Sequence, residues 1–295
     1  MKRILLVLVA LTLLLGSCGS APQPSDGSAP QRVAVLFSSL AEIWLEAGGE
    51  IAVTVGETVE RGFVPADTPL VDSGAGKTIN AELLISHKPD LVICSADIPA
   101  QVEAAQILAA AGIATLVLRV ETVDDYVEAL RRMTEITGDE AAYARGLAMK
   151  AEIDSHLASD NVQALRGKTV LFVRAGSTAS STKPKSSADH FAAMMLREFG
   201  CINLADRADT ALDGIGMEAI LAADPDYVFF SLMGDEASAR ENVATLLASD
   251  TWQALSAVKA GRTVILDRTL FHFKPCGRWA EAYQTLADLL TEDSL

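Results

Sequence analysis

The chain has 295 residues, half of them hydrophobic, and a formal net charge of -15 at pH 7. This length is enough for two modest folded lobes, each with its own core. The acidic balance argues against binding to nucleic acid, whose phosphates need Lys and Arg, and against adsorption on anionic lipid.

The first residues have the pattern of a lipoprotein signal peptide. A short positive segment precedes an apolar run at 4–15, which is too short to span a membrane comfortably. The run leads into Leu-Gly-Ser-Cys at 15–18, which resembles a bacterial lipobox. By that resemblance residues 1–17 are removed and Cys18 carries the lipid; an ordinary secretory signal with a chance cysteine is the alternative. We therefore expect an extracytoplasmic protein, at the cell surface or in the periplasm, that touches the membrane only through its lipid anchor.

Residues 18–31 are rich in Gly, Ser and Pro and predict a flexible tether, because this composition cannot bury apolar surface. Beyond Cys18 the cysteines are Cys94, Cys201 and Cys276. An odd number cannot all pair within one chain, and no zinc-type spacing occurs. The apolar neighbours of Cys94 and Cys201 favour two small core residues.

Residues 32–121 alternate between short apolar runs and helical spacing, which predicts an N-terminal α/β lobe. Strands are expected at 33–37, 51–55, 91–93 and 115–118, and helices at 40–47, 81–87 and 102–111. Strands that alternate with helices imply a mainly parallel sheet with helices on both faces.

Residues 122–160 predict a helical connection. Thr122 and Asp125 are spaced as a helix N-cap and its third-position acid, Gly138 interrupts the pattern, and a second helix is expected at about 140–157.

The alternation then resumes over 161–295, which we interpret as a C-terminal α/β lobe. Strands are expected at 169–174, 227–230 and 264–266, and helices at 191–199, 218–222 and 278–290. The simplest architecture has two such lobes, joined by a long connecting helix, with a ligand cleft between them.

The two lobes carry one pattern at identical spacing, at 82–90 and at 218–226. In each copy a Glu starts a short helix, Pro-Asp turns the chain, and an apolar strand follows. Helix-end and turn preferences explain part of this pattern. Two copies in corresponding places nevertheless suggest matched lobes.

These segments, together with the opening strand, the connecting helix and the closing stretch 252–264, resemble the ABC-importer solute-binding proteins for ferric siderophores, cobalamin and haem. The resemblance runs from about Arg32 to the C-terminus, and the order of the segments carries it. It implies a non-enzymatic protein, without a resident cofactor or metal, that delivers a small ligand to a permease and ATPase complex. We expect this protein to be a monomer.

In that family one glutamate on each lobe engages arginines of the membrane subunits. By position these residues are Glu82 and Glu218. The physical role of such a pair is to set the register of docking and the encounter rate. The alternative is that both are solvent-facing acids in the first turns of helices.

Parallel sheets bind ligands beyond the carboxyl ends of their strands. This rule nominates the loops at 38–39, 74–77, 95–97, 175–187, 232–234 and 267–274. Arg174 precedes a loop rich in hydroxyl groups, and we expect Arg174, Lys183 and Lys185 to neutralise an anionic ligand. A solvated loop whose lysines bind nothing is the alternative.

Three further residues are candidates for ligand binding: Lys77 at a cleft edge, Arg278 at a helix start, and Trp44 as a stacking surface. Core packing is the alternative for Trp44. The four histidines show no metal-ligand spacing, so no metal ligand is assigned. His272 lies on a candidate cleft loop where it could ligate haem iron, and an ordinary loop or core histidine is the more common alternative.

No catalytic signature accompanies these features. The stretch 74–78 resembles the end of a phosphate-binding loop, but Val71 stands where the first glycine is required. A lipid-anchored hydrolase that used Glu82 and Glu218 would need both carboxyl groups at one bond, and an adhesion protein would need no cleft. We predict the substrate-binding component of an ABC importer for a small metal chelate. The basic loop favours a ferric siderophore over cobalamin or haem.

Overall fold

The computed structural model describes residues 30–72, 78–207 and 216–291. The predicted signal peptide, the lipidation site Cys18, nearly all of the predicted tether and the candidate Lys77 lie outside the described residues. Within them, no helix combines the length and the apolar character needed to cross a bilayer.

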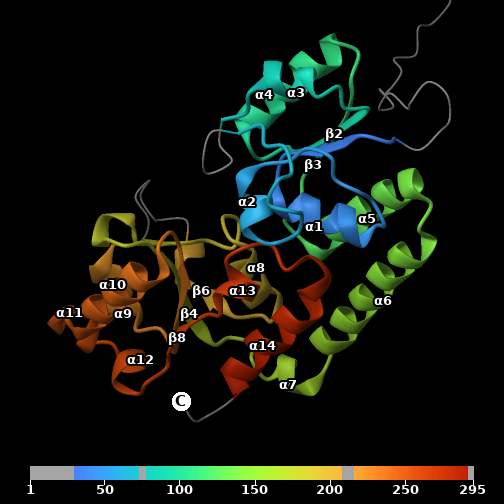
Figure 1. The fold of residues 1–295 in the computed structure, drawn as a ribbon. Helices are drawn as coiled ribbons and strands as arrows, with labels where there is room; N and C mark the ends of the chain where they lie inside the picture. Colours follow the sequence, from blue (N-terminus) through green and yellow to red (C-terminus); the bar gives the residue numbers. More distant parts are fainter. Residues whose placement is uncertain (1–29, 73–77, 208–215, 292–295) are drawn as a thin grey trace, which may run out of the picture.

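The first lobe, at the top of Figure 1, is built on a parallel sheet. Its strands lie in the order β1 (Val33–Val35), β2 (Leu91–Ser95) and β3 (Ala114–Leu118). All residues of the central strand β2 are buried, as expected for a strand covered on both faces. Its helices are α1 (Ser38–Glu46), α2 (Gly56–Glu60), α3 (Ala81–Ser86) and α4 (Pro99–Ala110).

The strand expected at 51–55 forms only isolated bridges. Val53 pairs with Ala34 on one side, and Thr54 pairs with Leu70 on the other. The segment lies between two neighbours: the Val35 amide donates to the Val53 carbonyl on one side, and the Thr54 amide donates to the Pro69 carbonyl on the other. Val53 and Val55 are buried, but the pairing on each side is limited to a single bridge.

The second lobe contains a larger mixed sheet. Its strands are β4 (Thr169–Ala175), β5 (Lys183–Pro184), β6 (Ile202–Asn203), β7 (Tyr227–Leu232) and β8 (Thr263–Ile265). Strand β4 pairs with β7 and β6 in parallel and with β5 antiparallel, and β7 pairs with β8 in parallel.

Helices surround this sheet (Figure 1). They are α7 (Asp160–Gln163), α8 (Phe191–Glu198), α9 (Met217–Ala223), α10 (Glu236–Ala248), α11 (Asp250–Gln253), α12 (Ser256–Lys259), α13 (Arg268–Phe271) and α14 (Trp279–Thr291), with the 3-10 turns η1 (Ala179–Ser181), η2 (Leu204–Asp206) and η3 (Cys276–Arg278). Helix α10 was not predicted, because its buried residues are only Ala239 and Val243 and no apolar stripe marks it.

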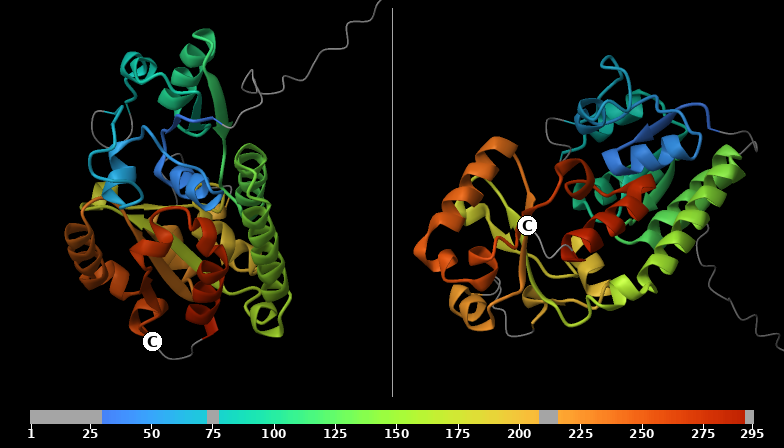
Figure 2. Two further views of the ribbon diagram at one scale, coloured as in Figure 1. Left: turned by 45° about the vertical axis from the view of Figure 1, so that its right-hand side comes forward. Right: turned by 90° about the horizontal axis from the view of Figure 1, so that it is seen from below.

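The two lobes are connected through α5 (Val123–Thr137) and α6 (Glu140–Leu157). The predicted capping box is present: the Thr122 side chain accepts from the Asp125 amide, and the Asp125 carboxylate accepts from the Thr122 amide. Gly138 ends α5 in the left-handed region, with φ of 82°. Helix α6 then runs along one side of the molecule from the first lobe to the second (Figures 1 and 2).

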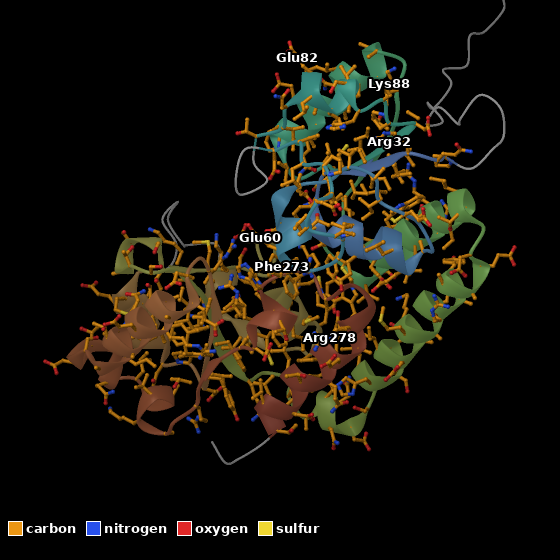
Figure 3. All side chains as sticks on the ribbon, viewed as in Figure 1. Arg32, Glu60, Glu82, Lys88, Phe273 and Arg278 are labelled. Carbon is orange, nitrogen blue, oxygen red and sulfur yellow. The ribbon has the colours of Figure 1, made fainter. Side chains whose placement is uncertain are left out.

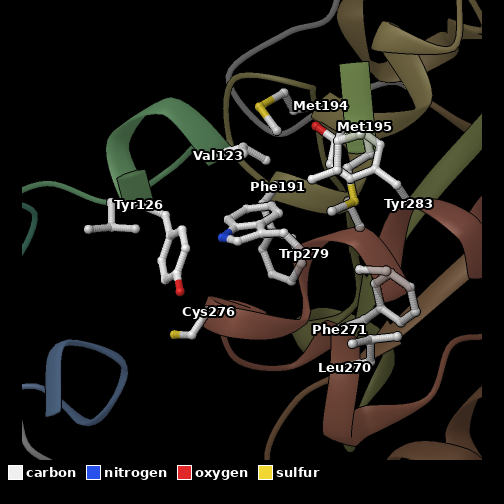
Figure 4. Packing of buried hydrophobic residues seen from close by; sticks show 14 of the residues in the cluster. Val123, Tyr126, Phe191, Met194, Met195, Leu270, Phe271, Cys276, Trp279 and Tyr283 are labelled. Carbon is white, nitrogen blue, oxygen red and sulfur yellow. The ribbon is translucent and has the colours of Figure 1, made fainter. Parts of the chain in front are cut away.

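One hydrophobic core runs through both lobes. Figure 4 shows its centre, where Trp279 of α14 lies among Phe191, Tyr126 and Cys276. Trp279 is fully buried, and its ring meets that of Phe191 edge-on, with ring centroids 5.7 Å apart. Because the lobes share this core, they cannot separate far without exposing it to water.

The sequence pattern shared by the two lobes also has the same backbone conformation in each lobe. Glu82 and Glu218 are each the second residue of a helix, α3 or α9. Lys88 and Asp224, each before a proline, both adopt a left-handed backbone, with φ of 50° and 41°. The two copies are therefore equivalent turns.

Candidate ligand-binding site between the lobes

A cavity of about 280 Å³ is lined by residues of both lobes. The first lobe contributes Phe37, Ser39, Glu57 and Glu121, and the second contributes Arg174, Asp189, His190, Phe191, His272, Phe273 and Lys274. Phe37 follows β1, and Arg174 lies near the end of β4, so the cavity lies at carboxyl ends of strands, as expected. Of the nominated loops, those at 38–39 and 267–274 line it.

Arg174 provides a positive charge that no group among the described residues neutralises. Its side chain makes no ion pair or hydrogen bond with another of the residues that the structure describes. Burial lowers the pKa of Arg174 from its ordinary value, but a guanidinium group remains protonated in proteins. A cation without a partner in a cavity wall is a ready binding group for an anionic ligand.

Lys274 is the second cation of the cavity, and it is already paired. Its Nζ contacts the carboxylate of Glu121 in the first lobe and lies 5.4 Å from the centre of the Phe191 ring. The neighbouring Phe273 lies between the lobes in Figure 3. The guanidinium carbon of Arg61 is 4.2 Å from its ring centre. The segment from 273 to 274 is therefore attached to the first lobe by a cation–π contact and an ion pair.

Two histidines of the cavity wall are held in opposite tautomers. Nδ1 of His190 accepts a hydrogen bond from the amide of Ala192, at 3.2 Å, so its proton is on Nε2. Nδ1 of His272 lies 2.8 Å from the carbonyl of Leu232, and a carbonyl can only accept, so Nδ1 carries the proton and Nε2 carries the lone pair.

Burial favours the neutral form of both imidazoles. Burial, with a smaller contribution from Arg174, lowers the pKa of His190 to about 3. Burial also lowers the pKa of His272, against the opposing effect of the Leu232 carbonyl. Neither residue was a predicted site residue. The loop rule had nominated the position of His272, but no sequence signal marked His190, which caps α8.

A second cavity of about 300 Å³ adjoins the first and shares the lining residues Glu121, His190 and Phe191. These three residues form the wall common to both cavities. Arg119 and Arg197 line only the second cavity.

The remaining predicted ligand residues lie elsewhere. Lys183 is exposed and pairs with Arg174 across the β4–β5 ladder, and neither it nor Lys185 lines the cavity. The guanidinium of Arg278 is exposed and held by Glu281 at 2.7 Å, and Arg278 does not line this cavity.

The expectation for Trp44 also needs correction. Its ring is 2% exposed and belongs to the shared core, and its Nε1 donates to the carbonyl of Glu50 at 2.9 Å. A Cβ placed on Gly49 would lie 2.1 Å from this ring, so the glycine allows the indole to pack there. Trp44 is therefore a core residue, since its ring cannot reach a ligand.

The two predicted docking residues lie on different lobes. Glu82 is exposed on α3, at the top of Figure 3, and Glu218 is exposed on α9 of the second lobe. Among the described residues, no group of three or more His, Cys, Asp or Glu is arranged to hold a metal ion.

The comparisons with known proteins agree on one type of fold. A family model described as periplasmic binding protein matches residues 33–270. A periplasmic haem-binding protein from Pseudomonas aeruginosa is 20% identical, with a TM-score of 0.69, over 90% of this chain and 94% of that one. The periplasmic vitamin B12-binding protein of Vibrio cholerae is 16% identical, with a TM-score of 0.70, over 90% and 98%. A siderophore-binding protein solved with ferric iron and two acinetobactin molecules is 18% identical, with a TM-score of 0.67, over 90% and 93%. No curated protein sequence matches the chain.

Proposed function

Because the chain belongs to the periplasmic binding protein family, we propose that it is the substrate-binding component of an ABC importer and that it captures an anionic ferric siderophore between its lobes. The observation that carries this proposal is the unpaired guanidinium of Arg174 in the wall of the cavity. Ferric siderophores present anionic oxygens, and a partly desolvated arginine binds such oxygens strongly.

The cavity also offers apolar contact. Phe37, Phe191 and Phe273 line it from both lobes and can pack against the organic part of a chelate. A few charged groups among aromatic rings are typical of small-molecule sites, in which the polar groups fix orientation and the rings supply buried area.

We propose that the two lobes move only a short distance towards each other when the ligand binds. The shared hydrophobic core and the single long helix α6 both oppose a wide opening of the lobes. The loaded protein then docks on its permease through Glu82 and Glu218, and separate ATPase subunits drive release. Cys18 is proposed to hold the protein at the membrane through its lipid, with residues 18–31 as the tether.

Haem and cobalamin are the alternative ligands. The free lone pair of His272 favours haem, because an imidazole can bind the iron of a porphyrin. The absence of a known catalytic motif and the membership of a binding-protein family both favour binding over hydrolysis.

Thermal unfolding with a panel of ligands tests the proposal. The mature protein would be heated with anionic ferric siderophores, haemin or cyanocobalamin, each at a hundredfold excess over its Kd. A ligand that binds only the folded state should raise Tm by about 5–10 °C. A rise with siderophores supports the proposal, and a rise only with haemin or cyanocobalamin selects an alternative. No rise with any of these ligands, or their turnover, contradicts a role in chelate binding.

A further inference from the structure

The cavity between the lobes carries charges of both signs. The first lobe contributes the acids Glu57 and Glu121, and the second contributes Arg174, Lys274 and the acid Asp189. Lys274 is paired with Glu121, so these two charges offset each other. Arg174 remains without an ion-pair partner among the described residues. A ligand that carried only negative charge would suit Arg174 but would be repelled by the remaining acids.

Glu57 is an acid of the cavity wall that forms no ion pair with any of the described residues. It lies in the first turn of α2 and is half-buried. Its Oε2 accepts a hydrogen bond from the hydroxyl of Ser38, the first residue of α1. The N-terminus of a helix stabilises a negative charge placed beside it, so α1 favours the charge of this carboxylate.

Arg61 approaches the same hydroxyl group but pairs with a different acid. Its Nη1 donates to Ser38 Oγ at 3.2 Å, and its Nη2 lies 2.7 Å from the carboxylate of Glu42. Oε1 of Glu57 accepts no hydrogen bond from the part of the chain that the structure describes. This oxygen is therefore available to a donor that a ligand brings.

The charges of Arg174 and Glu57 act on one part of the cavity. Burial is the largest influence on His272 and lowers its pKa; Arg174 lowers that pKa further, whereas Glu57 raises it. Asp189, the other unpaired acid, is exposed, and its Oδ2 accepts from the Ser186 hydroxyl at 2.6 Å. Water screens an exposed charge, so Glu57 is the acid whose charge a bound ligand has to match.

We propose that the ligand is an anionic chelate that also carries one ammonium group, which Glu57 binds while Arg174 binds the anionic oxygens. This inference rests on the proposed function and narrows its ligand class. When a chelate displaces water from the cavity, a carboxylate without a partner loses its hydration at a cost. An ammonium group replaces the lost water with a charge-assisted hydrogen bond. A chelate without the amine leaves Glu57 desolvated and unpaired, so the same carboxylate selects against it.

The test uses three ferric tris(catecholate) chelates that share one scaffold and differ only at a single pendant amine. The amine is free in the first chelate, dimethylated in the second and acetylated in the third. The free and dimethylated amines are positively charged at neutral pH, whereas the acetylated amine is neutral. Since the dimethylated and acetylated groups are similar in size, the comparison separates an effect of charge from an effect of bulk.

The wild type, Glu57→Gln and the control Glu60→Gln would be titrated with each chelate by isothermal titration calorimetry. Gln keeps an acceptor for the Ser38 hydroxyl but carries no charge. Glu60, labelled in Figure 3, is the last residue of the same helix, is exposed and does not line the cavity. Glu60→Gln therefore reports the loss of a negative charge outside the cavity wall.

Wild-type protein should bind the free-amine and dimethylated chelates at least about tenfold more tightly than the acetylated chelate. Glu57→Gln should reduce this preference to within about twofold, by weakening the binding of the two charged chelates. Glu60→Gln should keep the wild-type preference. Because the first comparison uses wild-type protein only, a variant that misfolds does not remove the test.

The outcomes separate the inference from the proposed function. Equal affinities of the wild type for all three chelates would overturn the inference, and the proposed function would stand. A preference for the charged chelates that persists in Glu57→Gln would overturn the role of Glu57 as the partner of the ammonium group. If no chelate binds the wild type, the proposed function fails for this ligand class, and the inference fails with it.

Discussion

Asp90 in the first lobe and Asp226 in the second make the same contact with the start of a parallel strand. Oδ2 of Asp90 accepts from the amide of Arg32 at 2.9 Å, and Oδ2 of Asp226 accepts from the amide of Thr169 at 2.7 Å. In each lobe the aspartate's own amide donates back to the carbonyl of the same residue. The sequence pattern shared by the lobes is therefore a shared way of joining a turn to the sheet.

Asp226→Ala should lower the free energy of unfolding by about 1–3 kcal/mol, because it removes a charged acceptor of the Thr169 amide and hydroxyl. Asp90→Ala should cost less, since Asp90 is exposed. Urea denaturation measures both. The exposed Asp67→Ala is the control, expected to stay within about 0.5 kcal/mol. An Asp226→Ala variant as stable as this control would show that the turn does not depend on the carboxylate.

Arg174→Met should weaken the binding of an anionic ferric siderophore at least about tenfold, because it removes the unpaired cation of the cavity. Its neighbour across the ladder, Lys183, is exposed and outside the cavity lining, so Lys183→Met should bind almost as the wild type does. Isothermal titration calorimetry measures both. Equal losses in the two variants would place the ligand over the exposed loop instead of in the cavity.

Glu82→Ala and Glu218→Ala should each reduce import while ligand affinity is unchanged, because both side chains are exposed and absent from the cavity lining. Radiolabelled uptake by cells or proteoliposomes with the cognate importer measures the effect. Glu152→Ala, an exposed residue of α6, is the matched control. Full import by a variant that carries both Glu82→Ala and Glu218→Ala would contradict a docking role for these residues.

Glu46 should make stability depend on pH. Burial raises its pKa above the ordinary 4.5, although its carboxylate accepts from the Tyr126 hydroxyl at 2.8 Å and the Gly277 amide at 3.0 Å. A raised folded-state pKa gives a contribution that is fully present below pH 4.5 and is lost as pH rises through the folded-state pKa.

Glu46→Gln should therefore gain stability relative to the wild type as pH rises from 4.5 towards neutrality. Urea denaturation across this range measures the difference. Glu281→Gln is the control, because its exposed carboxylate has a pKa lowered by Arg278 and should alter the pH profile only below 4.5. Parallel profiles for Glu46→Gln and the wild type would contradict the prediction.

Trp44→Phe should lower the free energy of unfolding by about 1–3 kcal/mol, because it removes buried ring atoms and the donor to the Glu50 carbonyl. Ligand affinity should not change, since the ring lies in the core. Denaturation and calorimetry on the same sample measure the two quantities. A loss of ligand affinity without a change in stability would show that Trp44 contributes to the binding site and not to the core.

Several elements were predictable because their signals are local. The helix expected at about 140–157 is found as Glu140–Leu157, and its start and the end of α5 are set by capping residues. Helix α10 was not predicted, because it buries only Ala239 and Val243 and its sequence therefore shows no apolar face. The segment at 51–55 has the composition of a strand but forms only a single bridge with each of its two neighbours.

The sequence by itself determined the alternation of strands and helices, the matched turns and the sheet edge at which the cavity lies, because periodicity and turn preference depend on near neighbours. Only the tertiary structure decided which side chains reach the cavity. It placed Arg174 but not Lys183 in the wall of the cavity, buried Trp44 in the core, joined Lys274 to Glu121, and set the tautomer of His272. These outcomes depend on contacts between residues far apart in the chain, which local patterns do not encode.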